Sequence, residues 1–149
     1  MTFIPMQEAE IYSTVGRELL AANALSPEDL SRSLALIGGH HIDYADIYCQ
    51  RTAFENWHLE EGMVKSGSFQ IDQGVGVRAV AGEKTAFAYA DNLSADSIRR
   101  SAQTVRVIGP AGGEAAVAPL SRRPAHIVHS ADDPIRSLDS AAKVALLNR

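Results

Sequence analysis

The sequence predicts an α+β domain, with a mainly antiparallel sheet of about four strands in a meander and helices packed on one face. Three observations favour this fold class. Extended patterns follow one another from residue 42 to residue 90. Helical patterns precede and follow that run, and short glycine-containing turns punctuate it. Strands and helices that occupy separate runs of a chain are typical of α+β domains.

Two helical segments are predicted before the sheet. The first spans about Ser13 to Ala22, and Asn23 is expected to stop it. The second begins at Ser26, because a serine followed three residues later by an acid, here Asp29, is the pattern of a capping box. Gly38-Gly39 is expected to end this second helix.

The stretch from Ile42 to Leu59 is predicted to be one long strand. Alternate residues such as Ile47 and Cys49 would share one face, whereas Phe54 begins a series on the other face. A phase change of this kind predicts a bulge or a twist near residues 51–53.

Three further strands are expected to complete the meander. Glu60-Glu61-Gly62 predicts a turn, and Met63–Gln70 predicts a strand of its own. The segment Gly67–Asn92 then predicts a hairpin, with its turn at residues 81–84. Its second strand alternates small and aromatic residues over residues 86–90, which is a period-two pattern.

A helix is predicted to leave the hairpin over Leu93–Ile108. Ser94 is expected to cap it, and Ile98, Ala102 and Val105 are spaced to face the sheet. This helix would close the predicted domain.

Three regions are predicted along the chain. Residues 1–110 form the α+β domain, and residues 111–136 form a linker rich in proline and glycine. Residues 137–149 begin a helix that the chain cuts in mid-course, which predicts a further C-terminal part.

Composition narrows the classes of function. The 14 Lys and Arg residues are outnumbered by 18 Asp and Glu residues, so direct nucleic-acid binding is disfavoured. No apolar run is long enough to cross a bilayer, so no membrane partner is expected. The single cysteine, Cys49, excludes an internal disulfide, and a cytoplasmic location is the simplest interpretation.

The spacing of residues 74–79 matches the dinucleotide-binding pattern G-x-G-x-x-A, but the segments around it do not. That pattern needs a helix directly after the strand, whereas here a strand and then a turn follow. We therefore expect Gly74 and Gly76 to lie in a strand where another backbone or side chain packs closely.

Two groups of histidines and acids could be drawn as metal sites. Neither has the one-turn spacing of a helical zinc motif, so no metal ligand and no catalytic residue is predicted. The groups are His40-His41 with Asp43 and Asp46, and His126 and His129 with Asp132 and Asp133.

Four single residues have a structural and a functional interpretation. Cys49 is expected to be a buried small apolar residue, and Trp57 and Tyr89 are expected to pack, although strand aromatics can also line a cleft. Arg78 is a charged residue in an apolar strand. It is expected on a solvated face, with a contact to an anion or carboxylate of the substrate as the alternative.

Most of the chain from Leu19 onward resembles the N-terminal part of the TldD/PmbA family, whose members are also named modulator of DNA gyrase. The similar segments are LLAANALSPEDL, HIDYADIYCQ, the long run from Glu55 to Asp91, and DPIRSL. The block from Ile71 to Asp91 is the most specific of them.

The resemblance implies a bacterial zinc metalloprotease that degrades or processes peptides, including peptide-antibiotic precursors and antitoxins. It also implies a related TldE/PmbA-like subunit or a homodimer as partner. In the family, zinc is held by an H-E-x-x-x-H motif and a later cysteine, and this sequence contains neither that motif nor a matching cysteine. The implied role is a non-catalytic N-terminal domain that binds no cofactor itself. Our own hypothesis is that its sheet walls or covers the substrate passage of the intact protein.

Two other functions stay open on the sequence. One is a pure protein-interaction module that binds a partner subunit or DNA gyrase. The other is a small nucleotide-binding enzyme built on the glycine pattern, which binding of NAD, FAD or ATP would reveal.

Overall fold

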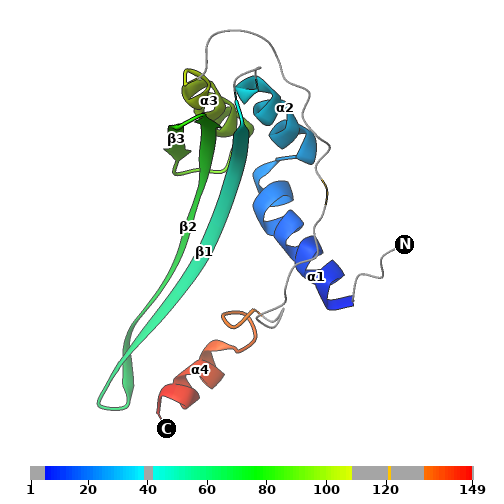
Figure 1. Ribbon diagram of the computed structural model, residues 1–149. Helices are drawn as coiled ribbons and strands as arrows, with labels where there is room; N and C mark the ends of the chain where they lie inside the picture. Colours follow the sequence, from blue (N-terminus) through cyan, green and yellow to red (C-terminus); the bar gives the residue numbers. More distant parts are fainter. Residues whose placement is uncertain (1–5, 39–41, 109–120, 122–132, 149) are drawn as a thin grey trace. The chain divides into compact units, whose positions relative to one another are not determined.

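A computed structural model describes residues 6–38, 42–108, 121 and 133–148 (Figure 1). Along the chain, helices come first, then three strands, then two further helices. The elements are α1 (Met6–Val15), the π-helical turn η1 (Gly16–Leu20), the 3₁₀ turn η2 (Ala21–Asn23), α2 (Pro27–Ile37), β1 (Tyr44–Glu60), β2 (Met63–Ala81), β3 (Lys84–Ala90), α3 (Ala95–Arg106) and α4 (Ser140–Leu147).

The chain divides into two compact units. The first comprises Met1–Arg51 with Gln73–Ala125, and the second comprises Thr52–Asp72 with His126–Arg149. The predicted linker at residues 111–136 lies almost entirely outside the described residues, so the predicted domain boundaries stay a prediction. The α+β fold class is confirmed.

The sheet has three antiparallel strands in the order β1-β2-β3, which corrects the predicted number of about four. The predicted strand Met63–Gln70 and the first strand of the predicted hairpin are one continuous strand, β2. Gly67 does not turn the chain. A Cβ atom placed there would lie 3.5 Å from the ring of Trp57, so the glycine lets the aromatic side chain pack against an extended backbone.

Both predicted hairpin turns are confirmed. Between β1 and β2, Glu61 and Gly62 both have positive φ (51° and 71°), as a two-residue type I′ turn requires. Between β2 and β3, Gly82 has φ 59°, and the register Ala81↔Lys84 leaves a two-residue loop. The local turn residues therefore set the strand pairing.

The predicted phase change in the first long strand is wrong. Trp57 and Leu59 stay less exposed than Asn56 and His58, which continues the odd-numbered face that Ile47 and Cys49 begin. Phe54, which was expected to begin a series on the other face, is 48% exposed. An apolar side chain on a two-sided strand does not by itself mark the buried face.

The core of the first unit lies between the sheet and the helices α2 and α3. Figure 1 shows these two helices side by side at the end of the sheet that carries β3. The predicted sheet-facing residues Ile98, Ala102 and Val105 are each 0% exposed. They form one cluster with the other buried apolar residues, Leu25, Ile37, Val75, Val77, Ala79 and Leu93.

The capping box predicted for α2 is confirmed. The Asp29 backbone N–H donates to Ser26 Oγ at 3.2 Å, and the Ser26 backbone N–H donates to Asp29 Oδ2 at 2.9 Å. Hydrogen bonding from Ser26 lowers the pKa of Asp29. Gly38 is the C-cap, whereas Gly39 lies outside the described residues.

The first helix begins earlier than predicted, at Met6 instead of Ser13. Its opening residues lack the apolar periodicity that marks a helix in a sequence, which is why the prediction missed them. The predicted stop is confirmed, because the amide of Asn23 donates to the carbonyl of Leu19 at 3.1 Å. Ala24 follows with φ 52°.

In the second unit, α4 begins three residues after the predicted start at Ser137. Asp139 caps it by accepting a hydrogen bond from the Ala142 N–H at 2.8 Å. Lys143 pairs with Glu55 of β1 at 2.6 Å, and each of these side chains is 17% exposed.

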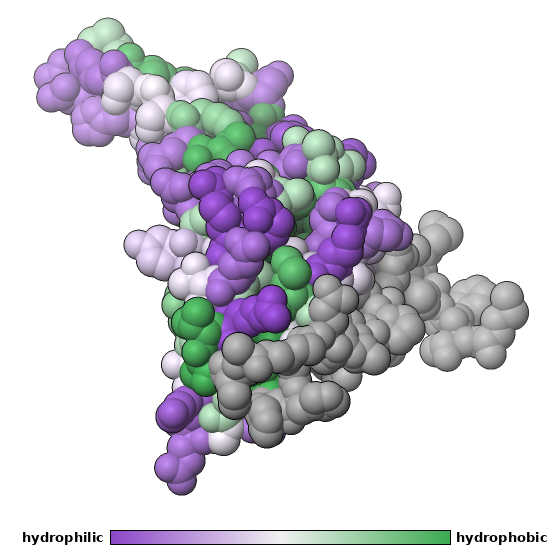
Figure 2. Space-filling view, turned by 90° about the horizontal axis from the view of Figure 1, so that it is seen from above, coloured by the Kyte–Doolittle hydropathy of each residue, from purple (hydrophilic) through white to green (hydrophobic). Residues whose placement is uncertain are grey.

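On the face drawn in Figure 2, hydrophobic residues form separate patches among hydrophilic ones. None of the helices in the described part of the chain is both long and apolar enough to cross a membrane.

Candidate functional site

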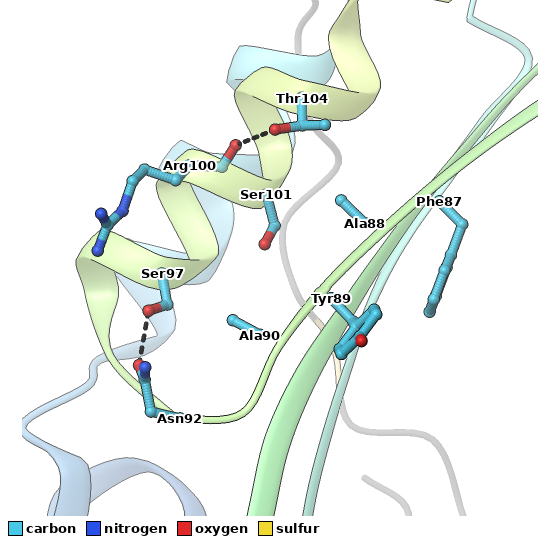
Figure 3. A pocket seen from close by; sticks show the side chains of 9 residues that line it. All are labelled: Phe87, Ala88, Tyr89, Ala90, Asn92, Ser97, Arg100, Ser101 and Thr104. Carbon is cyan, nitrogen blue, oxygen red and sulfur yellow. Dashed lines mark hydrogen bonds between the residues drawn. The ribbon is translucent and has the colours of Figure 1, made fainter.

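A groove of about 490 Å³ lies between β3 and α3 in the first unit (Figure 3). Its lining comes from consecutive residues of β3, from the connection to α3, and from one side of that helix. The lining residues are Phe87, Ala88, Tyr89, Ala90, Asn92, Ser97, Arg100, Ser101 and Thr104.

The groove follows an edge of the sheet. The order β1-β2-β3 gives β3 a partner strand on one side only among the described residues. That partner is β2, in a register that places Val77 opposite Ala88 and Val75 opposite Ala90. Successive side chains of a strand point to opposite faces, so a groove lined by four consecutive residues runs along the strand's edge.

The outer face of β3 is aromatic. Phe87 and Tyr89 are 64% and 78% exposed, and their ring centroids lie 6.5 Å apart in a stacked arrangement. Figure 3 shows both rings on the side of β3 away from the helix. Tyr89 was expected to pack, with lining of a cleft as the alternative; its ring stacks on Phe87 and it also lines the groove.

The helix side of the groove is polar and fixed by local hydrogen bonds. Ser97 Oγ donates to Asn92 Oδ1 at 2.6 Å, and Thr104 Oγ1 donates to the Arg100 carbonyl at 3.0 Å. Ser94 caps α3 as predicted, because its Oγ accepts from the Ser97 backbone N–H at 3.1 Å. These contacts hold the start of α3 against the end of β3.

Near the start of α3, two arginine side chains pair with a single aspartate. Arg99 and Arg100 each approach Asp96 at 2.6 Å, so two cations share one acid. The hydrogen bond from Arg99, with the charges of both arginines, lowers the pKa of Asp96. Arg100 also lines the groove, and Arg99, Arg100 and Asp96 together carry one net positive charge, although the whole chain carries −4.

Arg78, the candidate substrate contact, lies on the exposed face of β2 and already has a carboxylate partner. Its Nε and one terminal nitrogen donate to the two oxygens of Asp46 at 2.8 and 3.2 Å. Its guanidinium also lies 5.5 Å from the centre of the Tyr44 ring. The bond to Asp46 raises the pKa of Arg78. A role of Arg78 in substrate binding stays a prediction.

The glycines of the second strand pack closely, as predicted. A Cβ atom at Gly74 would lie 2.8 Å from the Ala90 carbonyl oxygen, and one at Gly76 would lie 3.0 Å from the Phe87 ring. Both glycines lie inside β2, and a turn follows that strand. The geometry therefore lacks the strand-to-helix turn that dinucleotide binding requires.

The described residues do not fit a metal ion. No group of three or more His, Cys, Asp or Glu side chains lies close enough to hold one in that part of the chain. Asp43 instead accepts a hydrogen bond from the Gly82 N–H at 2.6 Å. The other residues of the two groups considered from the sequence, apart from Asp46 and Asp133, lie outside the described ranges: His40, His41, His126, His129 and Asp132.

Cys49 packs as a small apolar residue against the core cluster. Burial raises the pKa of its thiol, which disfavours the thiolate that a nucleophile needs. Trp57 packs against Gly67 and donates its indole N–H to Glu55 at 2.8 Å. Sequence reasoning missed the groove, although the alternation of alanine and aromatic residues in β3 was visible as a signal.

Comparisons with a family model and with curated proteins point to the same family. Residues 45–118 match the model of PmbA/TldA metallopeptidase domain 1. The chain is 38% identical over 136 residues to the Metalloprotease TldD homolog of Haemophilus influenzae, which covers 90% of this chain and 28% of that protein. It is 37% identical over 133 residues to the protein of the same name from Buchnera aphidicola subsp. Schizaphis graminum, with coverages of 89% and 28%. The chain thus spans a little over a quarter of the length of these curated relatives.

Proposed function

The chain belongs to the TldD/PmbA family, and from this premise we propose that it is the N-terminal domain of a TldD-like zinc metallopeptidase. The observation that carries the proposal is the match of residues 45–118 to domain 1 of that family. The matched range includes nearly all of β1 and the whole of β2, β3 and α3. The sheet and its groove are therefore the part of the chain that the family model describes.

In this proposal the domain is non-catalytic. The zinc ligands belong to a later part of the full-length protein, and the domain contributes a wall of the passage through which peptides reach the metal. The substrates are peptides, such as peptide-antibiotic precursors and antitoxins, and the enzyme works in the cytoplasm with a TldE/PmbA-like subunit or as a homodimer. Within the described ranges β3 pairs with another strand on one side only, and this supports the role, since extended peptides pair with unpaired sheet edges.

The test uses a full-length relative, the Haemophilus influenzae protein. A variant that lacks the segment matching residues 1–110 should lose peptide cleavage while its zinc content, measured by metal analysis, stays unchanged. Adding the present 149-residue chain in trans is expected to restore part of the cleavage. Unchanged cleavage by the shortened protein would refute the proposal.

A non-catalytic interaction module is the second candidate function. Exposed apolar residues in the second unit favour it, because Phe54, Phe69 and Ile71 are 48%, 58% and 45% exposed. The genomic reading frame discriminates between the two functions. An H-E-x-x-x-H motif downstream of this domain supports the peptidase, and a frame without it supports the module that binds a partner subunit or DNA gyrase.

A further inference from the structure

We propose that the free edge of β3 binds an extended peptide as an additional strand, in the groove between β3 and α3. The inference rests on the proposed function and names the site at which the domain would contact its substrate. The ligand class is an unfolded peptide segment with an acidic side chain directed towards α3.

Main-chain chemistry identifies the ligand. In an antiparallel pair, alternate residues point their N–H and C=O groups away from the partner strand. Along Phe87–Ala90 such groups point to the side of the strand opposite β2, with which β3 pairs on its other side. An extended peptide offers matching donors and acceptors at the strand spacing of roughly 4.8 Å.

The dimensions of the groove fit this ligand. Four residues in extended conformation span roughly 13 Å, the length of β3 that lines the groove. Ala88 and Ala90 present only methyl groups there, and Figure 3 shows them pointing into the space in front of Ser97 and Ser101. The volume of about 490 Å³ is within the usual range of ligand sites.

Along the part of β3 that lines the groove, the described residues lack the charges, prolines and bulges that normally protect a sheet edge; Lys84, at the start of the strand, lies outside this part. Natural edge strands carry charges, prolines or bulges that prevent pairing with another chain. Residues 86–90 contain only alanine, phenylalanine and tyrosine, and β3 pairs with β2 in an unbroken register. An unprotected edge beside a groove is expected where pairing is the function.

Charge gives the preference for an acidic peptide. Arg100 lines the groove and shares Asp96 with Arg99, which leaves one positive charge without a partner acid among these three groups. A carboxylate of the added strand would complete the pairing. A lysine at the same place would meet like charge.

The first measurement is a titration of the ¹⁵N-labelled chain with the heptapeptide Ser-Val-Asp-Val-Asp-Val-Ser. We expect amide shifts centred on Phe87–Ala90 and on the groove side of α3. The matched controls are the same peptide with alternate backbone nitrogens methylated and a peptide with lysine in place of aspartate. Both controls should bind at least about tenfold more weakly. Methylation removes backbone N–H donors, and lysine replaces the carboxylate that would pair with Arg100.

The second measurement compares variants at two neighbouring exposed positions on α3. Thr104→Trp fills the groove and should weaken binding about tenfold, whereas Gln103→Trp, which does not line it, should leave binding unchanged. Shifts located elsewhere, equal binding of the methylated peptide, or no shifts at millimolar peptide would each overturn the inference. If Thr104→Trp does not fold, the comparison of the methylated and unmethylated peptides, made with the unaltered chain, tests the inference instead.

Failure here is separable from failure of the proposed function. If the domain deletion abolishes cleavage but the titration shows no binding at β3, then the domain serves the peptidase in another way.

Discussion

Arg78 of β2 and Asp46 of β1 form a two-point ion pair across adjacent strands, with the Tyr44 ring beside the guanidinium. The pair lies on the open face of the sheet, where 48% of the Arg78 side chain is exposed. Asp46 therefore supplies to Arg78 the carboxylate contact that the alternative interpretation assigned to a substrate.

Asp46→Asn is therefore expected to change the stability of the domain little, since exposed ion pairs contribute little to folding. Arg78→Lys should likewise leave the denaturation midpoint nearly unchanged, but it should alter the chemical shifts of the Tyr44 ring, because lysine cannot make the planar two-point contact. A large loss of stability in either variant would contradict this interpretation. Urea denaturation and aromatic NMR spectra are the measurements.

Gly74 and Gly76 are expected to differ in their tolerance of alanine. Gly74→Ala should destabilise the domain by about 1–3 kcal/mol, because the new methyl group would lie 2.8 Å from a backbone oxygen that moves only with the strand. Gly76→Ala should change stability by less than about 1 kcal/mol, because the exposed Phe87 ring can rotate away and the unfolded chain loses freedom. Chemical denaturation of the two variants makes the comparison, and equal losses would contradict it.

The side-chain N-cap of α2 is expected to contribute about 1 kcal/mol to the free energy of unfolding of the domain. Ser26→Ala removes the side-chain oxygen that accepts the Asp29 N–H, and it leaves that donor without its cap. Ser31→Ala is the matched control, since Ser31 bonds only to a carbonyl of its own exposed helix surface and alanine is the better helix former. Thermal unfolding should show a lower midpoint for the first variant only.

The pairing of Glu55 with Lys143 should make α4 sensitive to acid. The hydrogen bond from Lys143, together with that from Trp57, lowers the pKa of Glu55 in the folded state. The stabilisation is therefore present above the ordinary glutamate pKa of 4.5 and is lost as the pH falls through the lowered value.

Amide exchange of α4 residues, followed from about pH 6 to about pH 3 and corrected for the intrinsic pH dependence of exchange, should show this loss. Lys143→Met should remove most of the acid sensitivity while it retains the length of the side chain. The same pH profile in wild type and variant would show that the pair does not hold α4.

Glu61→Asn is expected to stabilise the hairpin between β1 and β2. Glu61 has φ 51°, a conformation that costs an ordinary residue about 1 kcal/mol and that asparagine tolerates better. Asn-Gly is also the preferred pair for a type I′ turn. The gain should appear as slower amide exchange in the strands next to the turn, and Glu60→Asn, one residue outside the turn, is the control that should show none.

Local signals predicted the local structure well. The capping serines and the turn glycines act on residues close in sequence, and the buried stripe of α3 repeats at helical spacing within one segment, so their patterns could be read directly. The number of strands and the phase of β1 were misjudged because a glycine and an exposed phenylalanine have several possible roles. Their neighbours in space, such as Trp57 beside Gly67, decide among these roles.

The alternating alanine and aromatic residues of β3 are visible in the sequence, but the groove that they line depends on how separate segments are arranged. Two facts about arrangement produce it: in the described part of the chain β3 has a partner strand on one side only, and α3 lies beside it. The Glu55–Lys143 pair is a similar case, because its members are 88 residues apart. Nothing in either segment alone specifies such a contact.

By itself, the sequence determined the helix caps, the hairpin turns, the core-facing residues of α3 and the family to which the chain belongs. The tertiary structure alone decided which strand edge has no partner among the described residues, which carboxylate Arg78 binds, and that Phe87 and Tyr89 are exposed. The physical reason is that backbone and capping preferences act over a few residues, whereas edges, grooves and distant ion pairs form only when separate segments pack together.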